Sequence, residues 1–453
     1  MATAIVWFRQ DLRLADNPAL LAATYAARQM VPVFIWSPEE EGEWAPGGAA
    51  RWWLHESLQR LDASLRERGS RLLLLRGPTL QALKSLLAAT GATQLYWNCR
   101  YEPAALRVEA EVRQMLAASG RTGHGFQSSR LVEPGSVKGA SGDCVQVFTP
   151  FARAFLAQAN IDAPEGSPHE IPPPAKWPDS LGFADLALLP TSRWHDKLAQ
   201  HWQPGETAAR AVLKQFVQQH LADYGESRDR ADLQSTSRLS PYLRHGELSP
   251  RQVWTAVVAA LVRKGETEEE APRGKFCSEL IWREFATQQL VLHPALPDRA
   301  RSGVFDAMQW RNEARELAAW TRGETGEEFV DAGMRELWQT GWMHNRVRMV
   351  VASYLVKNLL HDWRAGERWF WDTLVDADLA SNAYNWQWVA GISPDAAPWF
   401  RIFNPQTQAE KFDPEGAYRR RFLTDSKRPL ASLVDLKQSR QRALDAMKRA
   451  SGR

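Results

Sequence analysis

Short apolar runs alternate with amphipathic stretches through the first part of the chain. Four of these runs are β-rich and too short for an ordinary helix, so we interpret them as buried strands: 4–8, 30–36, 71–76 and 94–98. Residues 51–68 and 79–89 lie between the runs, repeat apolar positions every three or four residues, and are predicted to be helices. This alternation predicts a parallel sheet covered by helices.

The hydrophobic pattern changes in the middle of the chain. Residues 160–205 are crowded with Pro, Gly and Ser, which is typical of a long surface connection. Beyond this segment no strand pattern recurs, and we predict amphipathic helices that include 206–221, 249–263, 275–290 and 346–360. The predicted fold class is α/β plus all-α, divided into an α/β domain, an interdomain linker and a helical domain: 1–130, 131–204 and 205–453.

The composition narrows the class of protein. At 453 residues the chain exceeds the ~250–300 at which a single core stops growing, so two domains are expected. With 56 Lys+Arg against 53 Asp+Glu, the net charge is only +3, and nucleic-acid binding would require a local basic face. Three widely spaced cysteines, no export signal and no apolar run of ~18 residues lead us to expect a cytoplasmic protein without a membrane span.

The first predicted strand lacks the usual dinucleotide fingerprint. Residues 9–13 follow it with no glycine, and no P-loop motif occurs, so a bound nucleotide would belong to the helical domain. There, the hydroxyls and backbone amides of 236–240 precede a helix predicted to begin near Pro241, an arrangement that can bind an anion. A simple helix N-cap explains the same residues, and this alternative stays open.

Glu279, Trp282 and Arg283 have a spacing that places a carboxylate, an indole and a guanidinium on one helix face. A flat indole can stack on a displaced base, and the polar groups can read the base. The alternative is a structural Trp packed beneath an exposed ion pair.

The run 340–349 predicts a helix start that puts Asn345, Arg348 and Met349 on one side and turns Arg346 away, although a solvated basic flank would look similar. Residues 376–388 combine two acids, an amide and two Trp, too polar and too aromatic for an ordinary core helix. His344 and His361 have no second ligand at metal spacing, so no metal site is expected.

Four long strings resemble the photolyase/cryptochrome family: VWFRQDLRLADNPAL, ELIWREF, TGWMHNRVRM and DAAPWFRIFNPQTQAEKFD. The resemblance covers nearly the whole chain and is most like a cyclobutane pyrimidine dimer photolyase of class I or III. It implies an N-terminal Rossmann-like antenna domain, a linker, and a C-terminal helical domain that binds FAD.

The family pattern implies contacts with FAD at twelve positions. Phosphate contacts fall on Tyr224, Thr236, Ser237, Arg238, Leu239 and Ser240. Contacts around the flavin fall on Phe276, Arg348, Asp376, Ala377, Asp378 and Asn382. Phe276 stands where many relatives carry Trp, which keeps an aromatic face but loses an N–H donor.

The same resemblance implies a lesion pocket and a DNA surface. Glu279 would hydrogen-bond the dimer in a protonated or proton-donating state, Trp282 and Trp388 would stack on it, and Asn345 and Met349 would line the pocket. The DNA strand would contact Arg228, Arg346, Arg401 and Gln408, and a relay of Trp386, Trp363 and Trp310 would carry electrons to oxidised flavin. The implied function is light-dependent repair of UV-damaged DNA by a monomer.

Two related functions stay open as alternatives: a cryptochrome that binds FAD and signals without repair, and a photolyase for the (6-4) photoproduct. Glu279, both pocket Trp residues and Asn382 favour repair over signalling, and Met349 favours cyclobutane dimers over the (6-4) product.

Family members carry a second, antenna chromophore in the first domain. Glu40, Trp44, Arg51 and Glu102 are the expected neighbours of a pterin, so we expect a folate (methenyltetrahydrofolate) rather than a deazaflavin.

Overall fold

The first domain is built on a five-stranded parallel sheet. The computed structural model describes residues 3–396, 398–399, 401–424 and 431–452. Its strands, in the spatial order β3-β2-β1-β4-β5, are β1 Thr3–Phe8, β2 Gln29–Trp36, β3 Leu73–Arg76, β4 Gln94–Asn98 and β5 Thr122–Phe126. The four predicted strands are confirmed, and the parallel sheet with them.

Strand β5 escaped the sequence prediction because it has no apolar run. Its sequence is TGHGF, and none of its residues is fully buried. A Cβ on Gly123 would lie 2.7 Å from Leu116 and 2.9 Å from Trp97, so packing against the neighbouring strand and helix excludes a side chain there. Because close packing requires glycine in β5, its sequence lacks the apolar run that is typical of a buried strand.

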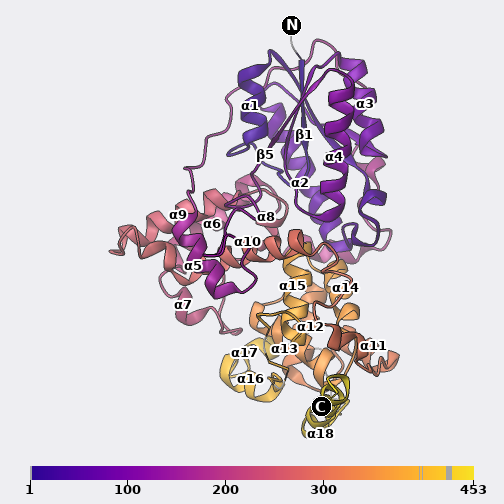
Figure 1. Ribbon diagram of the computed structural model, residues 1–453, viewed down its shortest axis with the longest axis vertical. Helices are drawn as coiled ribbons and strands as arrows, with labels where there is room; N and C mark the ends of the chain where they lie inside the picture. The colour runs from indigo at the N-terminus through magenta and orange to yellow at the C-terminus, as the bar shows by residue number, and fades with distance from the viewer. Residues whose placement is uncertain (1–2, 397, 400, 425–430, 453) are drawn as a thin grey trace.

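Helices cover both faces of the sheet: α1 Pro18–Ala26, α2 Gly48–Arg66, α3 Thr79–Thr90 and α4 Pro103–Ala118. Alternate residues of β1 point to opposite faces, so Val6 and Phe8 pack with α1 and α2, whereas Ile5 and Trp7 pack with α3 and α4. The expected helices at 51–68 and 79–89 are confirmed as α2 and α3. Figure 1 shows this layered domain above the helical one.

The rest of the described chain, beyond β5, contains no further strand. Its helices are α5 Phe148–Gln158, α6 Glu206–Gln219, α7 Tyr224–Ser227, α8 Ser240–Arg244, α9 Pro250–Arg263, α10 Lys275–Leu292, α11 Ala314–Arg322, α12 Glu328–Thr340, α13 Asn345–Ser353, α14 Trp363–Thr373, α15 Leu379–Ala390, α16 Pro405–Phe412, α17 Ala417–Phe422 and α18 Leu436–Ala450. No described helix is long and apolar enough to cross a membrane.

The helix predicted over 346–360 is divided into two parts. Helix α13 ends at Ser353, and a π-helical turn over Tyr354–Asn358 follows it. Within this turn the buried Lys357 donates from Nζ to the backbone oxygen of Arg401 at 2.8 Å. Periodicity predicted the helical character of the segment but not the change of winding.

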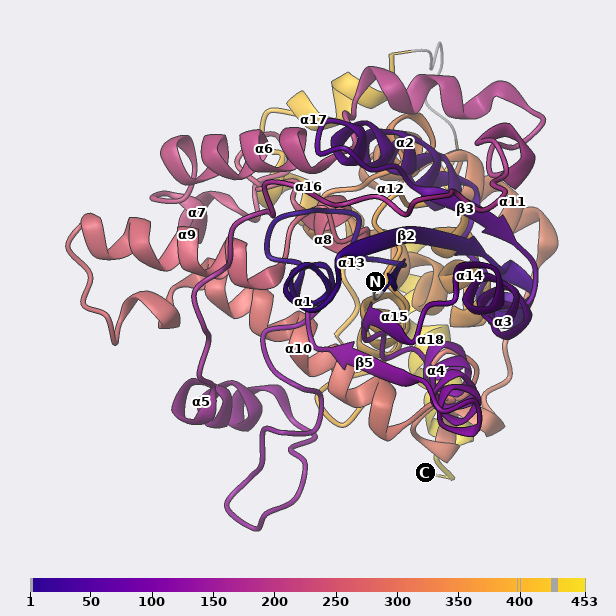
Figure 2. The ribbon, with the colours of Figure 1, turned by 90° about the horizontal axis from the view of Figure 1, so that it is seen from above.

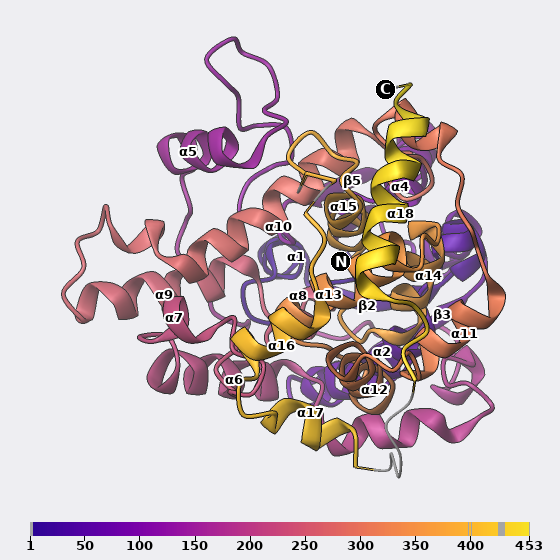
Figure 3. The ribbon, with the colours of Figure 1, turned by 90° about the horizontal axis from the view of Figure 1, so that it is seen from below.

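The segment between the domains is more than a surface connection. It contains α5, whose Phe151 and Phe155 are buried in the core of the helical domain beside α10. Farther on, Ile171 and Leu186 are buried against the α/β domain. The hairpin that precedes α5 projects from the body of the protein (Figures 2 and 3). The boundaries 131 and 204 stay predictions.

A buried polar seam joins the two domains. Glu247, after α8, accepts hydrogen bonds from Trp53 Nε1 (3.0 Å) and Ser57 Oγ (2.5 Å) of α2, and from Gly205 N (2.6 Å). Arg251 of α9 pairs with the buried Asp16 at 2.6 Å. Burial raises the pKa of Glu247 to about 8, against the lowering effect of its three donors.

We predict a pH-dependent contribution of Glu247 to stability. Because its pKa is raised on folding, the folded state binds the proton more tightly than the unfolded state between about pH 4.5 and 8, so this group's contribution falls as pH rises through that window. Glu247→Gln removes the dependence. Denaturant unfolding at several pH values measures the free energy of unfolding. Between about pH 4.5 and 8, this free energy should fall by a few kcal/mol, as an order of magnitude, in the wild type relative to the variant.

Glu111 of α4 is exposed, and Glu111→Gln is the control. Its free energy of unfolding should change with pH as that of the wild type does. Parallel profiles for wild type and Glu247→Gln would contradict the prediction.

Candidate functional site

A cavity of about 520 Å³ opens in the helical domain, between α7, α8 and α10 on one side and α13 and α15 on the other. Ten of the twelve predicted FAD contacts line it: Tyr224, Ser237, Leu239, Ser240, Phe276, Arg348, Asp376, Ala377, Asp378 and Asn382. Seven predicted lesion or DNA contacts line it as well: Arg228, Glu279, Trp282, Asn345, Arg346, Met349 and Trp388. Residues far apart in sequence therefore meet at one site.

Four other predicted contacts do not line this cavity. Arg238 packs between the rings of Trp202 (4.2 Å) and Trp342 (4.9 Å), with its backbone at φ +52°, and Thr236 lies outside the lining. Arg401 is exposed in the loop before α16, and Gln408 is half-buried on that helix. These four roles stay predictions.

The proposed phosphate segment differs in one respect from the expected helix start. Helix α8 begins at Ser240, as predicted, but it has only five residues, so its dipole is weak. The hydroxyl of Ser240 donates to Asp376 Oδ2 at 2.6 Å, while Ser237 Oγ accepts from the backbone N–H of Leu239 at 3.3 Å. The segment therefore offers an anion hydroxyls and individual amides rather than a strong helix dipole.

Arg348 and Asp376 form an ion pair on the cavity wall. Arg348 Nη2 lies 2.9 and 3.2 Å from the two carboxylate oxygens of Asp376, and Arg348 Nε donates to the backbone oxygen of Met343 at 2.8 Å. The pair presents a donor and an acceptor side by side, which suits the polar edge of a heterocycle such as the flavin ring.

Asp378 is a buried carboxylate surrounded by arginines. It caps α15 by accepting from Ser381 N at 2.9 Å and pairs with Arg130 Nη2 at 3.1 Å. Burial alone would raise its pKa, but Arg130, with Arg283 and Arg244, holds the pKa of Asp378 well below its ordinary value. Burial, with Arg130 nearby, lowers the pKa of Arg283 to about 10.

This cluster leaves a cationic hydrogen-bond donor free for a ligand. Three arginines surround Asp378, and Arg283 and Arg244 also line the cavity. Arg283 Nη1 is buried without a hydrogen-bond partner among the described residues, so it is a donor left over for a ligand. Such a donor set suits FAD, which carries two phosphates.

Glu279 is paired with cations rather than standing alone. Arg228 Nη1 donates to Glu279 Oε1, and Lys275 Nζ lies 3.7 Å from the same oxygen. Glu279 therefore lies in an ion-pair network, and the proton-donating role expected from the family pattern stays a prediction.

A second carboxylate extends this chain of charges along the cavity rim. Asp229 Oδ2 accepts from Arg346 at 2.5 Å, and Asp229 Oδ1 lies 3.6 Å from Arg228. Arg346, expected to turn away, also lines the cavity. Next to it, burial lowers the pKa of His344 to about 4, and its Nδ1 caps α13 by accepting from Arg346 N at 3.2 Å.

Trp386 packs tightly at the inner end of the cavity. Its ring centroid lies 5.0 Å from that of Phe370 and 6.3 Å from that of Trp320. A Cβ on Gly366 would lie 2.1 Å from this indole, so only glycine leaves room for it. The other two predicted relay residues lie outside the cavity lining: Trp363 is fully buried and Trp310 is half-buried.

Two residues near the site were missed in the sequence. The backbone oxygen of Glu367 accepts from Asn382 Nδ2 at 3.1 Å, and burial raises the pKa of the Glu367 carboxyl well above its ordinary value. Phe148 lies face to face against Trp282. Neither residue has a motif around it, and only tertiary contacts identify them.

The expected antenna residues gather at a separate cleft between the domains. The cleft has a volume of about 350 Å³ and is lined by Glu40, Trp44 and Glu102, but not by Arg51. Trp44 Nε1 donates to Asp298 at 3.2 Å. Glu40 already accepts from the backbone N–H and the hydroxyl of Thr79, both at 2.7 Å.

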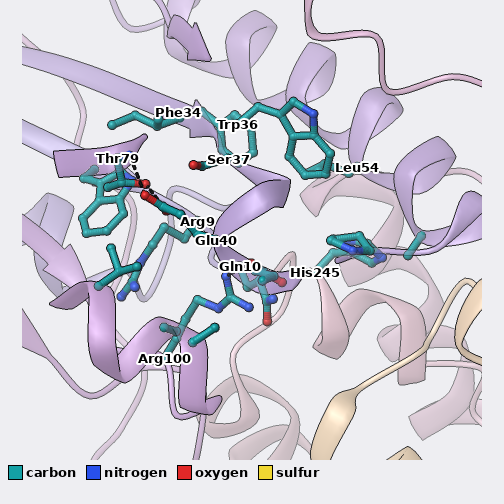
Figure 4. Close-up of a pocket in the computed structure, with 18 of the residues that line it drawn as sticks. Arg9, Gln10, Phe34, Trp36, Ser37, Glu40, Leu54, Thr79, Arg100 and His245 are labelled. Carbon is teal, nitrogen blue, oxygen red and sulfur yellow. Dashed lines mark hydrogen bonds and ion pairs between the residues drawn. The ribbon is translucent and has the colours of Figure 1, made fainter. Parts of the chain in front are cut away.

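A smaller pocket of about 80 Å³ adjoins this cleft and reaches the ends of the central strands (Figure 4). Glu40, Trp36 and Arg100 line it, together with Arg9. Arg100 is held at its mouth by Glu41 (2.8 Å) and Glu102 (3.2 Å).

Comparison with known proteins identifies the class. Residues 4–175 match the DNA photolyase family and residues 276–429 match the FAD binding domain of DNA photolyase. A deoxyribodipyrimidine photo-lyase of Agrobacterium fabrum is 45% identical over 94% of this chain and 87% of its own, and cryptochrome-1 of Arabidopsis thaliana is 37% identical over 94% of this chain and 63% of its own. A bacterial class III photolyase structure from Agrobacterium tumefaciens superposes with a TM-score of 0.94, at 42% identity, over 100% of this chain and 98% of its own.

The chain belongs to the DNA photolyase/cryptochrome family, and its helical part is an FAD-binding domain. The predicted family and fold class are confirmed.

We predict that Asp378→Asn destabilises the protein by about 3–5 kcal/mol at neutral pH, because it keeps the helix cap but removes the carboxylate that is ion-paired with the buried Arg130. A carboxyl whose pKa is depressed on folding stabilises the protein above its ordinary pKa of 3.8, and this contribution is lost as pH falls through the folded value. The deficit measured by denaturant unfolding should therefore shrink below about pH 4.

Asp362→Asn is the matched control. Asp362 caps α14 in the same way, accepting from Arg364 N at 3.0 Å, but its ion pair with Arg364 is partly exposed. A loss of under about 1 kcal/mol is expected there. Equal losses in the two variants would exclude a special role for the buried cluster.

Proposed function

We propose that this protein is a light-dependent repair enzyme that binds FAD and splits cyclobutane pyrimidine dimers in UV-damaged DNA. The observation that carries the proposal is one cavity that joins a flavin-compatible polar wall, Arg348 and Asp376, to a base-compatible wall of Trp282, Trp388 and Glu279. The Agrobacterium relative named deoxyribodipyrimidine photo-lyase supports the same substrate.

The cavity residues divide into a cofactor end and a lesion end. Arg283, Ser237 and Tyr224 would hold the FAD phosphates, and Arg348, Asp376 and Asn382 would contact the ring. When bound in its reduced form, FAD supplies the electron that light drives into the dimer. The protein's part is to fix the ring, exclude water and place the lesion.

At the lesion end, Trp282 and Trp388 would stack on the extruded dimer, with Asn345 and Met349 completing the pocket. Base–aromatic stacking is worth about 1–3 kcal/mol per base, and extrusion costs less for a damaged base than for a paired one. Stacking therefore favours the lesion over undamaged DNA.

Two arginines of the cavity lining, Arg228 and Arg346, would bind the DNA backbone, together with Arg401 and Gln408 outside the lining. Such contacts position the strand and make affinity salt-dependent without giving sequence preference. A phosphate that draws Arg228 away from Glu279 would free this carboxyl to reach the dimer. Glu279 would then hydrogen-bond the dimer in the proton-donating role that the family resemblance implies, as negative charge develops there.

We also propose a folate antenna in the interdomain cleft. Glu102 and Glu40 can accept hydrogen bonds from a pterin, and Trp44 offers an aromatic face. The adjoining pocket in Figure 4 has a volume of only about 80 Å³, which disfavours a buried deazaflavin there.

Trp386, Trp363 and Trp310 are proposed as the relay to oxidised flavin, leading from the cavity wall to a half-buried position. Because one chain supplies both ends of the cavity, we propose a monomer, and its three free cysteines fit a reducing cytoplasm.

The decisive experiment illuminates the pre-reduced, FAD-loaded protein with an oligonucleotide that carries one thymine dimer and follows recovery of base absorbance. Recovery that requires both light and reduced FAD supports repair. An FAD-loaded protein that gives no recovery would instead favour a signalling role of the cryptochrome type.

We predict that Glu279→Ala lowers repair per absorbed photon several-fold while FAD remains bound, because the variant loses a hydrogen-bonding group at the dimer. Repair quantum yield and flavin absorbance are the measurements. Glu226→Ala on α7, an exposed carboxylate, should repair normally. An unchanged yield in Glu279→Ala would remove this residue from the mechanism.

We predict that Trp386→Phe blocks light-driven reduction of oxidised flavin but spares repair by chemically reduced enzyme, since only the first process needs a relay. Flavin absorbance under illumination with an external reductant measures the first process. Trp254→Phe, a buried residue of α9, controls for the loss of an indole. Normal photoreduction in Trp386→Phe would refute the relay.

A further inference from the structure

Trp282 is supported from behind by a second aromatic ring. The ring of Phe148 lies parallel to the indole, with centroids 3.4 Å apart and an interplanar angle of 5°. Trp282 lines the cavity, whereas Phe148 does not. Phe148 therefore covers one face of the indole, and Trp282 is the ring of the pair that borders the cavity.

Phe148 is itself held by the loop that follows the opposite wall. It is the first residue of α5, and its backbone N–H donates to Asp395 Oδ2 at 2.9 Å. Asp395 lies just beyond α15, the helix that carries Trp388. The hydrogen bond between Asp395 and Phe148 thus links the loop after Trp388 to the ring that packs against Trp282.

Helix α5, which begins with Phe148, is anchored to α10. Phe151, one turn along, is buried with its ring centroid 5.1 Å from that of Phe285 on α10, the helix that carries Trp282. Phe285 and Tyr384 contact Trp282 as well, at 5.8 and 6.1 Å. Within the described parts of the chain, Trp388 has no comparable ring contact.

The two walls therefore differ in how firmly they are held before DNA binds. An indole packed between rings has already lost its rotamer freedom, so ordering it on binding costs little. A half-buried indole without a ring partner must be ordered by the ligand. The fixed wall sets the plane on which the first base of a lesion stacks.

We propose that Phe148 is a positioning residue for lesion recognition: it holds Trp282 in its stacking plane, and through Asp395 it fixes the gap between the two indoles in the free protein. This inference rests on the proposed lesion-binding role of the cavity. Phe148 acts through Trp282 and does not touch the DNA.

The test compares Phe148→Leu, which keeps apolar bulk but loses the ring, with Phe148→Tyr, which keeps the ring. The Kd of the FAD-loaded protein is measured for an oligonucleotide with one thymine dimer and for the undamaged oligonucleotide, at one salt concentration. Phe148→Leu should weaken binding to the dimer about three- to tenfold and leave binding to undamaged DNA unchanged. Phe148→Tyr should bind both as the wild type does.

Phe151→Leu is the matched control, because it weakens the packing of α5 without touching Trp282. It should lower Tm and leave the preference for the dimer unchanged. Equal weakening of binding to damaged and undamaged DNA in Phe148→Leu would overturn the proposal.

A second pair of variants tests the link without altering the ring. Asp395→Ala removes the acceptor for the Phe148 N–H, whereas Asp395→Asn keeps an acceptor oxygen. Asp395→Ala should lose preference for the dimer and Asp395→Asn should keep it. Equal behaviour of the two variants would overturn the coupling.

A variant of Trp282 separates this inference from the proposed function. Trp282→Leu should lose preference for the dimer, and adding Phe148→Leu should weaken it no further. If Trp282→Leu binds the dimer normally, the proposed lesion pocket itself is wrong. If Trp282→Leu loses the preference while Phe148→Leu retains it, the pocket stands and the positioning role is refuted.

Discussion

The ion pair between Asp378 and Arg130 connects most of the parts that form the site. Arg130 follows the last strand of the α/β domain and also donates to Thr287 of α10, while Asp378 caps α15. The carboxylate thus fixes the start of the helix that carries Asn382, Trp386 and Trp388. The buried pair thus links the segment after the α/β domain to α10 and α15, two helices that line the cavity.

The arginines at the rim of the cavity are likewise paired with carboxylates of the protein. Arg228 is paired with Glu279, and Arg346 with Asp229, in the protein without DNA. Under the proposed function, a DNA phosphate would have to compete with these internal partners, and the cost of breaking each pair would reduce the gain from binding. The internal carboxylates would thereby weaken attachment to DNA that offers no further contacts.

Sequence patterns and family motifs predicted the fold and most of the residues that line the site, but not the ion pairs and ring contacts that these residues form. Apolar runs located β1 to β4, whereas the glycines of β5 concealed a strand whose shape is set by Trp97 and Leu116. Family motifs located Arg348 and Asp376, whose spacing along the chain says nothing of the ion pair they form. The pairing of Glu279 and the stacking of Phe148 on Trp282 depend on contacts between distant segments, which no local pattern records.

Gly366 has a consequence for attempts to stabilise this protein. Glycine in a helix interior costs about 0.5–1 kcal/mol relative to alanine, so replacing it is an ordinary route to higher stability. In α14 that exchange would place a methyl group 2.1 Å from the Trp386 indole and 2.7 Å from Leu355, so these side chains would have to shift. An engineering choice made from helix propensity alone would therefore disturb a residue that lines the cavity.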